Sequence, residues 1–228
     1  MLKKLPLWIK VGGGVLAYSA GCVNSTALVG FTHLSASHVT GNVSLFATAI
    51  AHKDIKMLLM VCAVLLSFLF GSVISGYVVG STNLKAGRRY GTALSIEAVL
   101  LIISLMLFTQ HSFLGHFFAT MACGLQNSMV ATYRGAGIRT THLTGLTSDM
   151  GASIGNWLAG RGTDKKMVMF QAMIWYCFCG GGVTGAILYV KIGYLALILP
   201  IVIVISSAML YHWIFLKWEK FHHEQPNL

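Results

Sequence analysis

Long apolar runs separated by short polar stretches make up most of the chain. Six runs approach the ~20 residues that an α-helix needs to cross a bilayer, and they extend from Trp8 to Leu28, Met57 to Gly80, Ala93 to Phe108, Ser112 to Thr132, Met167 to Val190 and Gly193 to Leu216. Two shorter runs, Val39 to Ala51 and Leu143 to Ala159, begin at a Thr-Gly break. The pattern predicts an all-α polytopic membrane protein with two short helices.

The polar interruptions recur in the second half of the chain. Four matches occur in the same order: Asn24-Ser25 with Asn127-Ser128, His38-Val39-Thr40-Gly41 with His142-Leu143-Thr144-Gly145, Asp54-x-Lys56-Met57 with Asp164-x-Lys166-Met167, and Gly71 and Gly76 with Gly180 and Gly185. Matches of this kind indicate two copies of one unit. We expect a first repeat over residues 1–110, a second over 111–220 and a polar tail over 221–228, all within a single membrane domain.

Composition agrees with a membrane protein. Hydrophobic residues make up 56% of the chain, against only six acids, which is outside the usual range of soluble domains. The net charge of +10 does not indicate a nucleic-acid partner, because the basic residues stand singly or in small groups between apolar runs. Such charges orient the loops of a membrane protein. The expected partner is therefore the lipid bilayer.

The short helices either re-enter the membrane or cross it together with their links. A helix over residues 39–51 covers only ~20 Å, and the link at residues 31–37 can reach the midplane only if protein or water covers it. If both helices re-enter, thirteen basic residues lie on the cytoplasmic side and three lie outside; if both cross, the count is ten to six. The positive-inside rule favours re-entry.

Re-entry fixes the predicted topology. The outside residues are Lys53, Lys56 and Lys191, and the cytoplasmic ones are Lys3, Lys4, Lys10, Lys85, Arg88, Arg89, Arg134, Arg139, Arg161, Lys165, Lys166, Lys217 and Lys220. Each repeat then has three full spans, an odd number, so the second copy is inverted and both termini are cytoplasmic. Inverted repeats with broken helices are typical of secondary transporters.

Several short motifs carry a resemblance to a known family. They are Gly21-x-x-Asn24, Phe31, Thr40-Gly41-Asn42, Gly124-Leu125-Gln126-Asn127 and the segment from Thr140 through Asp149. Together they resemble the YoaK-like family of bacterial membrane proteins, also called the domain of unknown function 1275 family. The resemblance implies a multi-pass protein of the bacterial inner (plasma) membrane and no particular activity. Asn24 stands where we expect the family's Gly-x-x-Asp, which argues against proton coupling at that position.

The starts of the two short helices are the candidate binding site. Unpaired N–H groups in the first turn of a helix favour an anion or a carbonyl group. The predicted substrate-binding residues there and one link upstream are Asn24, Ser25, Thr40, Gly41, Asn42, Gln126, Asn127, Thr144 and Gly145. The alternative is structural: Thr40 and Thr144 cap their helices, the glycines allow close packing, and the amides hold helices together.

Two acids, Glu97 and Asp149, stand in apolar surroundings. Charged groups there are costly and commonly face a cavity or a partner, so both are candidates for proton coupling. Asp149 lies in the second turn of its short helix and could instead complement the helix dipole or pair with Arg139. Glu97 has no such neighbour in the sequence, which makes it the stronger candidate.

Other classes of function find less support. No metalloprotease, nucleophile-elbow or phosphate-loop motif is present in the sequence, so we predict no enzyme, no cofactor and no metal site. The leading hypothesis is a secondary transporter or permease for a small molecule, with an anion as one option. The rival is a structural or regulatory membrane protein that transports nothing. Glycine pairs four residues apart, as at Gly151 and Gly155, allow contacts inside the protein or across a homodimer.

Overall fold

The computed structural model describes residues 7–31, 33–80, 87–131 and 140–224. In this part of the chain the regular structure is helical, as predicted. The elements are α1 (Leu7–Val29), α2 (Val39–Ala51), α3 (Ile55–Val79), α4 (Gly87–Thr109), α5 (Leu114–Ala131), α6 (Leu143–Leu158), α7 (Lys165–Ile192), the 3₁₀ helix η4 (Gly193–Leu197) and α8 (Ile198–Glu224).

Three helical stretches among the described residues are long and apolar enough to cross a membrane. They are Ile55–Val79, Arg89–Thr109 and Lys165–Trp213, the last of which contains α7, η4 and most of α8. Many large apolar side chains on their surface are exposed, such as Leu66, Phe70 and Val183. Soluble proteins rarely expose so large an apolar surface to water. These stretches suggest a membrane protein.

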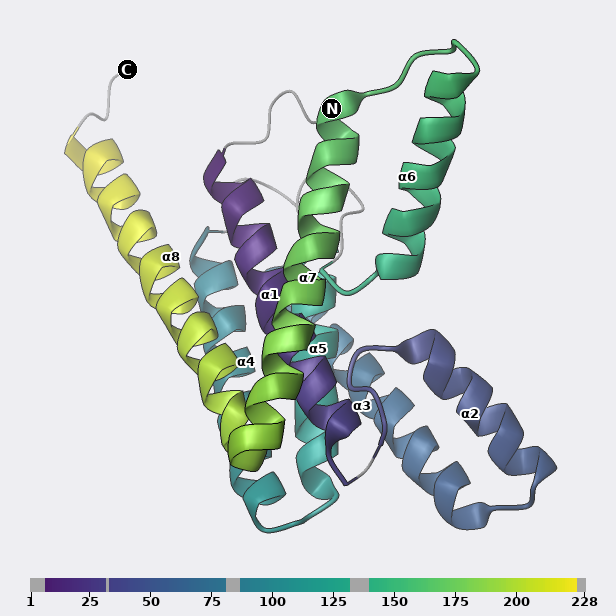
Figure 1. Cartoon of the computed structure of the whole chain (residues 1–228). Coiled ribbons are helices and arrows are strands. Elements are labelled where there is room, and N and C mark those ends of the chain that lie inside the picture. Colours follow the sequence, from purple (N-terminus) through teal and green to yellow (C-terminus); the bar gives the residue numbers. More distant parts are fainter. Residues whose placement is uncertain (1–6, 32, 81–86, 132–139, 225–228) are drawn as a thin grey trace.

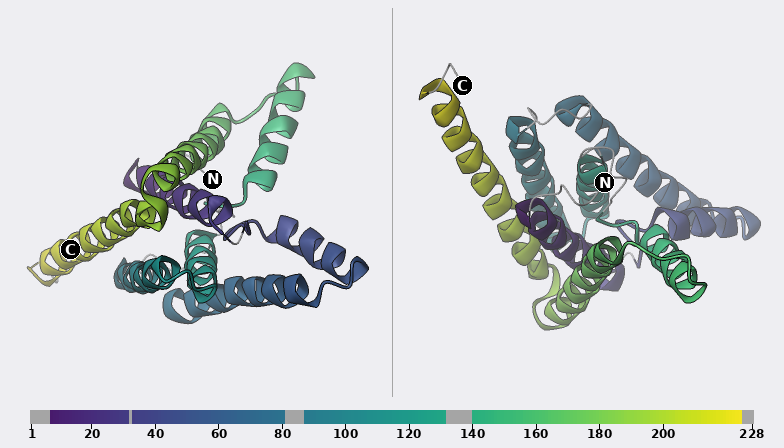
Figure 2. Two further views of the ribbon diagram at one scale, coloured as in Figure 1. Left: turned by 60° about the horizontal axis from the view of Figure 1, so that its bottom comes forward. Right: turned by 90° about the horizontal axis from the view of Figure 1, so that it is seen from above.

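The long helices α1, α3, α4, α5, α7 and α8 form the body of the molecule, and α2 and α6 project from it (Figure 1). α1 begins and α8 ends at the top of the view in Figure 1, whereas α2 joins α3 at the bottom. α2 runs downward from near mid-height, and α6 runs upward from near mid-height to meet α7 at the top. The starts of α2 and α6 lie close together in every view (Figures 1 and 2).

Glycines allow the backbones of α1 and α7 to touch. A Cβ atom on Gly21 of α1 would collide with the carbonyl of Phe178, and one on Gly181 of α7 would collide with the carbonyl of Tyr18. A Cβ atom on Gly185 would also collide with the backbone of Cys22, at 2.5 Å from its carbonyl oxygen. Small residues drive helix association in lipid because they permit such close approach. The first helix of the chain is therefore fastened to a helix of its last third.

α3 and α5 meet in the same way. A Cβ atom on Gly71 of α3 would collide with the carbonyl of Met121, and one on Gly124 of α5 with the carbonyl of Phe68. A Cβ atom on Gly76 would have no neighbour within 4 Å. The buried residue one turn after Gly71 is Ser75. Gly185 therefore lies in a helix contact, whereas Gly76, its counterpart in the sequence pattern, does not.

The recurring aspartates cap the helices that follow the projecting ones. The Asp54 carboxylate accepts a hydrogen bond from the N–H of Met57 at 3.0 Å, and the Asp164 carboxylate accepts from Lys166 at 3.0 Å and Met167 at 3.2 Å. N-cap acceptors satisfy the first free N–H groups of a helix. They fix the turns through which the chain leaves α2 and α6.

Candidate functional site

The carboxamide of Asn24 holds the link between α1 and α2. The Oδ1 atom of Asn24 accepts from the N–H of Ser37 at 2.9 Å, from the Ser37 hydroxyl at 2.9 Å and from the Ser35 hydroxyl at 2.5 Å. The Ser35 Oγ atom in turn accepts from the N–H of His38 at 3.1 Å, at the N-cap of α2. Asn24 therefore sets the position at which α2 begins.

Asn42 secures the same link from the other side. It is buried in the first turn of α2, and its Nδ2 donates to the carbonyl of Ser35 at 2.9 Å. A non-helical segment cannot face lipid unless its backbone groups are satisfied. Asn24 and Asn42 supply such partners, so the structure brings these two predicted site residues together around the link.

The link before α6 is held in a similar manner. The Oδ1 atom of Asn127 accepts from the N–H of Thr141 at 3.4 Å, directly before the N-cap His142. The buried Gln126 donates through Nε2 to the carbonyl of Leu16 in α1 at 2.9 Å and to the hydroxyl of Thr140 at 2.9 Å. Gln126 thus ties α5, α1 and the start of α6 to one another.

The two short helices begin one residue earlier than their threonines. Their N-caps are His38 and His142, and neither makes a side-chain capping bond. The alternative that Thr40 and Thr144 are the N-caps is therefore wrong. Both threonines are exposed in the first turn, where their hydroxyls are accessible to a ligand.

Gly41 and Gly145 make room for the capping histidines. A Cβ atom on Gly41 would collide with the imidazole ring of His38, and one on Gly145 with that of His142. Each ring therefore folds back over the first turn of its own helix. The glycines serve local packing here, which is the structural role that the sequence left open for them.

Ser25 lies apart from this cluster. Its hydroxyl faces α7, because a Cβ atom on Gly182 would come within 2.9 Å of Ser25 Oγ. Ser25 belongs to the contact between α1 and α7, one residue along the helix from Asn24 but on another face.

The two candidate acids differ in environment. Glu97 of α4 is 2% exposed, and its Oε2 atom has no hydrogen-bond partner among the described residues. α4 packs on α5. Asp149 is exposed on α6, and Arg139, its suggested partner, lies outside the described residues. Glu97 is therefore an interior carboxyl, and Asp149 is a surface residue of a projecting helix.

Sequence reasoning missed the partners of the amides. Ser35, Ser37 and Thr140 complete both hydrogen-bond clusters, yet none was predicted as a site residue. Their position in short polar links beside a candidate Asn or Gln was the available signal. The spacing of a link does not show which hydroxyl will turn toward which carboxamide.

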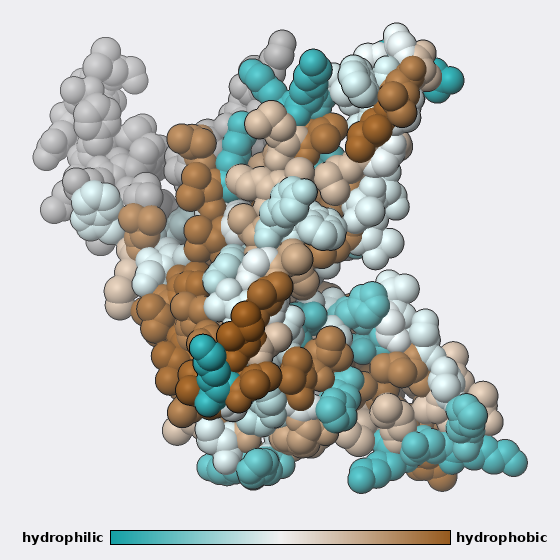
Figure 3. Space-filling model, viewed as in Figure 1, coloured by the Kyte–Doolittle hydropathy of each residue, from teal (hydrophilic) through white to brown (hydrophobic). Residues whose placement is uncertain are grey.

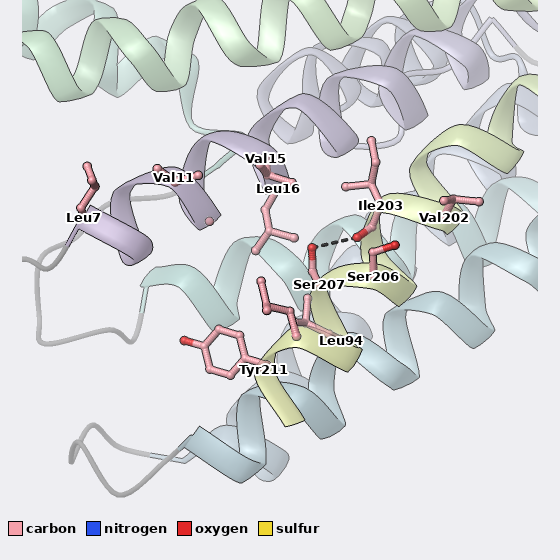
Figure 4. A pocket seen from close by; sticks show the side chains of 12 residues that line it. Leu7, Val11, Val15, Leu16, Leu94, Val202, Ile203, Ser206, Ser207 and Tyr211 are labelled. Atoms are coloured by element: carbon pink, nitrogen blue, oxygen red, sulfur yellow. Dashed lines mark hydrogen bonds between the residues drawn. The ribbon is translucent and has the colours of Figure 1, made fainter. Parts of the chain in front are cut away.

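Two hollows of the outer surface differ in character. A notch separates α6 from α2 in the space-filling view (Figure 3). A cavity of about 750 Å³ lies between the first half of α1, α4 and α8 (Figure 4). Its lining is apolar apart from Ser206, Ser207 and the hydroxyl of Tyr211, and the Ser207 hydroxyl donates to the carbonyl of Ile203. None of the predicted substrate-binding residues lines this cavity.

The described part of the chain is a helical protein with three stretches that suggest a membrane protein and with two short helices that start from amide-anchored links. The chain belongs to the family described as "Protein of unknown function (DUF1275)", whose model matches residues 13–210. Neither the curated proteins nor the solved structures contain a match to this chain. The resemblance to the domain of unknown function 1275 family is thereby confirmed.

The anchoring role of Asn24 can be tested with two near-isosteric changes. Asn24→Asp keeps an acceptor for the three donors on the link, so it should unfold at nearly the wild-type temperature. Asn24→Leu leaves these donors without an acceptor. Each buried unpaired donor costs about 1–3 kcal/mol of folding stability, so the apparent Tm should fall clearly. Thermal unfolding in detergent measures both; equal Tm values for Asn24→Leu and wild type would contradict the role.

Proposed function

We propose that the protein is a small-molecule permease of the bacterial inner membrane, with its substrate site where α2 and α6 begin. The observation that carries this proposal is the arrangement of these helices, which start side by side near mid-height and run in opposite directions (Figure 1). Helix N-termini attract anions and carbonyl groups. The exposed hydroxyls of Thr40 and Thr144 would add a donor from each helix, so a small anion is the favoured substrate.

The proposal includes two inverted repeats, over residues 1–110 and 111–220. The packing pairs support it: α1 packs on α7 as α5 packs on α3, and α4 packs on α8. The contact of α1 with α7 is equivalent to the contact of α5 with α3 under this repeat, and α4 and α8 are themselves corresponding helices. Inverted repeats of secondary transporters hold their substrate at such an interface.

The proposed topology has both termini in the cytoplasm and two re-entrant helices. The start of α1, the end of α8 and the α6–α7 turn share one side of the molecule, and the α2–α3 turn lies on the other (Figure 1). The shared side carries Arg161, Lys165, Lys166 and, in the last part of α8, Lys217 and Lys220, whereas the other side carries Lys53 and Lys56 at the α2–α3 turn and Lys191 at the end of α7. The excess of basic residues on the first side supports its assignment to the cytoplasm.

Cysteine labelling tests this topology. On a background without the native cysteines, Lys53→Cys should react with a membrane-impermeant maleimide added outside intact cells, and Arg161→Cys should react only after the cells are opened. The two positions serve as controls for each other. Labelling of position 53 from the cytoplasm alone would contradict the model with re-entrant helices and would favour a topology in which all eight helices cross the membrane.

A panel of small anions tests the function. A substrate at about 100 times its Kd should stabilise the purified protein by about 2.7 kcal/mol and should cross proteoliposomes faster than protein-free vesicles. Thr40→Ala and Thr144→Ala should reduce the stabilisation, since each removes a donor, whereas Thr109→Ala at the far end of α4 should not. Failure of every anion on the panel to bind or cross would count against an anion permease.

The second candidate is a structural or regulatory membrane protein without transport. The observation in its favour is that Asn24, Asn42, Gln126 and Asn127 are all engaged in internal hydrogen bonds. Only the exposed threonines are then left to bind a substrate. Thr40→Ala and Thr144→Ala would change nothing measurable if this candidate is right.

A further inference from the structure

The contact of α1 with α7 and the contact of α5 with α3 correspond residue for residue. The residues that touch are Tyr18 with Gly181 and Gly21 with Phe178 in the first contact, and Met121 with Gly71 and Gly124 with Phe68 in the second. In α5 each of them follows its counterpart in α1 at the offset that separates Asn24 from Asn127. In α7 the offset from α3 is the one that separates Asp54 from Asp164. A position in one half of the chain can therefore be compared with its counterpart in the other.

α4 and α8 correspond in their pattern of burial. The residues buried at the same spacing are Ala93, Leu94, Glu97 and Leu101 in α4 and Pro200, Ile201, Val204 and Ala208 in α8. This register makes Tyr211 the counterpart of Ser104. The two helices also pack on each other, with the rings of Tyr90 and Tyr211 at 5.9 Å between centroids. A Cβ atom on Gly91 would lie 2.7 Å from Nδ1 of His212. We call these two helices the α4–α8 pair.

The contact of the α4–α8 pair with α5 is closed. The Ser104 hydroxyl of α4 donates to the carbonyl of Gly115 in α5 at 2.8 Å, and a Cβ atom on Gly115 would collide with the ring of Phe108. Phe108 is buried and stacks on Tyr194 of η4, with ring centroids 4.3 Å apart. α4 and α5 therefore touch up to the turn that joins them.

The equivalent contact of the pair with α1 is open. Gly12 is the counterpart of Gly115 at the constant offset between α1 and α5, and Tyr211 is the counterpart of Ser104. Gly12 and Tyr211 both line the cavity of about 750 Å³ between α1, α4 and α8 (Figure 4). A Cβ atom on Gly12 would have no neighbour within 4 Å. Two halves that agree at their glycine contacts thus differ here, where one contact is formed and its counterpart is a cavity.

We propose that the α4–α8 pair rocks between two positions. In the structure described here the pair is closed on α5 and open on α1, and in the other state it is closed on α1 and open on α5. Two inverted repeats can each take the conformation of the other, so a fold with one open and one closed contact has a counterpart with the two exchanged. One closed contact replaces its equivalent, which keeps the two states similar in free energy. The Ser19 hydroxyl donates to the Pro200 carbonyl at 3.5 Å and marks where α8 stays against α1 as it tilts.

This motion rests on the inverted repeats of the proposed function and gives the permease a mechanism. α1 and α5 carry Asn24 and Gln126, which hold the links before α2 and α6, and rocking leaves their glycine contacts with α7 and α3 intact. The site stays in place while the pair moves past it. The open contact lies toward the side where α1 begins, and the closed contact toward the α4–α5 turn (Figure 1). The two states therefore open opposite sides of the molecule, as alternating access requires.

Two matched pairs of spin labels test the rocking on the full chain in liposomes. On a cysteine-free background, Val11→Cys with Trp213→Cys reports the contact of α1 with α8, and Leu114→Cys with Met106→Cys reports that of α5 with α4. All four side chains are exposed, and Val11 and Leu114 are counterparts. Distance measurements by electron paramagnetic resonance should give two populations for each pair of labels. A single population for both pairs would overturn the proposal.

A bulky side chain in the cavity tests whether the two contacts are coupled. Gly12→Trp fills the cavity and prevents closure on α1, so the long-distance population between α5 and α4 should fall about tenfold. Val15→Trp, also in the cavity lining, should act in the same way. Gly76→Trp is the control, because this open glycine of α3 does not line the cavity, and it should leave both distributions unchanged. A change between α1 and α8 alone would overturn the rocking of α4 and α8 as a pair.

The spectroscopic outcome is independent of transport. Two coupled populations without flux of any anion on the panel would support the rocking and count against the permease. Flux that persists in Gly12→Trp, with a single population for each pair of labels, would overturn the rocking and leave the permease standing.

Discussion

Gly71→Ala should lower the apparent Tm of the purified protein more than any other single-methyl addition in α3. The added Cβ atom would occupy the place of the Met121 carbonyl, so α3 and α5 must move apart along their whole contact. Overpacking of a tight contact costs about 1–3 kcal/mol. Thermal unfolding in detergent, followed by the exposure of buried cysteines to a thiol-reactive dye, measures the change.

Gly76→Ala is the matched control, because it adds the same methyl group to the same helix at a site without neighbours. It should leave Tm unchanged or raise it slightly, since alanine is the better helix former. Equal losses in both variants would mean that α3 does not approach α5 as described. A loss in Gly76→Ala alone would indicate that the open side of α3 has a partner.

Glu97→Gln should abolish uptake driven by a pH gradient once a substrate is known. Glu97 is an interior carboxyl with an unpartnered oxygen among the described residues, in α4, which packs on α5. A proton taken up or released at this carboxyl would change the charge in the interior of the helix bundle. A carboxamide has nearly the same shape but carries no exchangeable acid proton, so uptake in proteoliposomes should fall to the level of protein-free vesicles.

The variant should keep its fold and its substrate-induced stabilisation, because Gln fills the same space without introducing a charge. Asp164→Asn is the control for the loss of a carboxyl, since Asp164 caps α7 on the surface and should not affect coupling. Normal gradient-driven uptake by Glu97→Gln would reduce Glu97 to a polar packing residue.

Most helices were predictable from the sequence. The hydrophobic runs located α2 and α6 to within a residue, because a polar link precedes each of them and an aspartate cap follows. The sequence did not predict which residues of each helix lie in the helix contacts. Gly76 resembles Gly185 by spacing, yet the buried position in α3 is Ser75. Composition reveals that small residues recur, but only packing decides which of them turns toward a neighbour.

The sequence predicted where the polar residues of the candidate site lie better than it predicted what their side chains bond to. Asn24, Asn42, Gln126 and Asn127 do gather at the links before α2 and α6, but their carboxamides are already engaged with the backbone and hydroxyls of the chain. Ser25 turned out to face α7. A pattern of polar residues in an apolar chain identifies where the backbone must be satisfied, and this requirement has the same sequence signature as a binding site.

The glycine contact between α1 and α7 has a consequence for how the protein is made. α1 leaves the ribosome first, while Gly181 is synthesised ~160 residues later, which takes on the order of 10 s at typical rates of translation. During that time the Gly21 face of α1 has no partner in the membrane. Assembly must therefore wait for the second half of the chain, and a product truncated before α7 would be a ready substrate for membrane quality control.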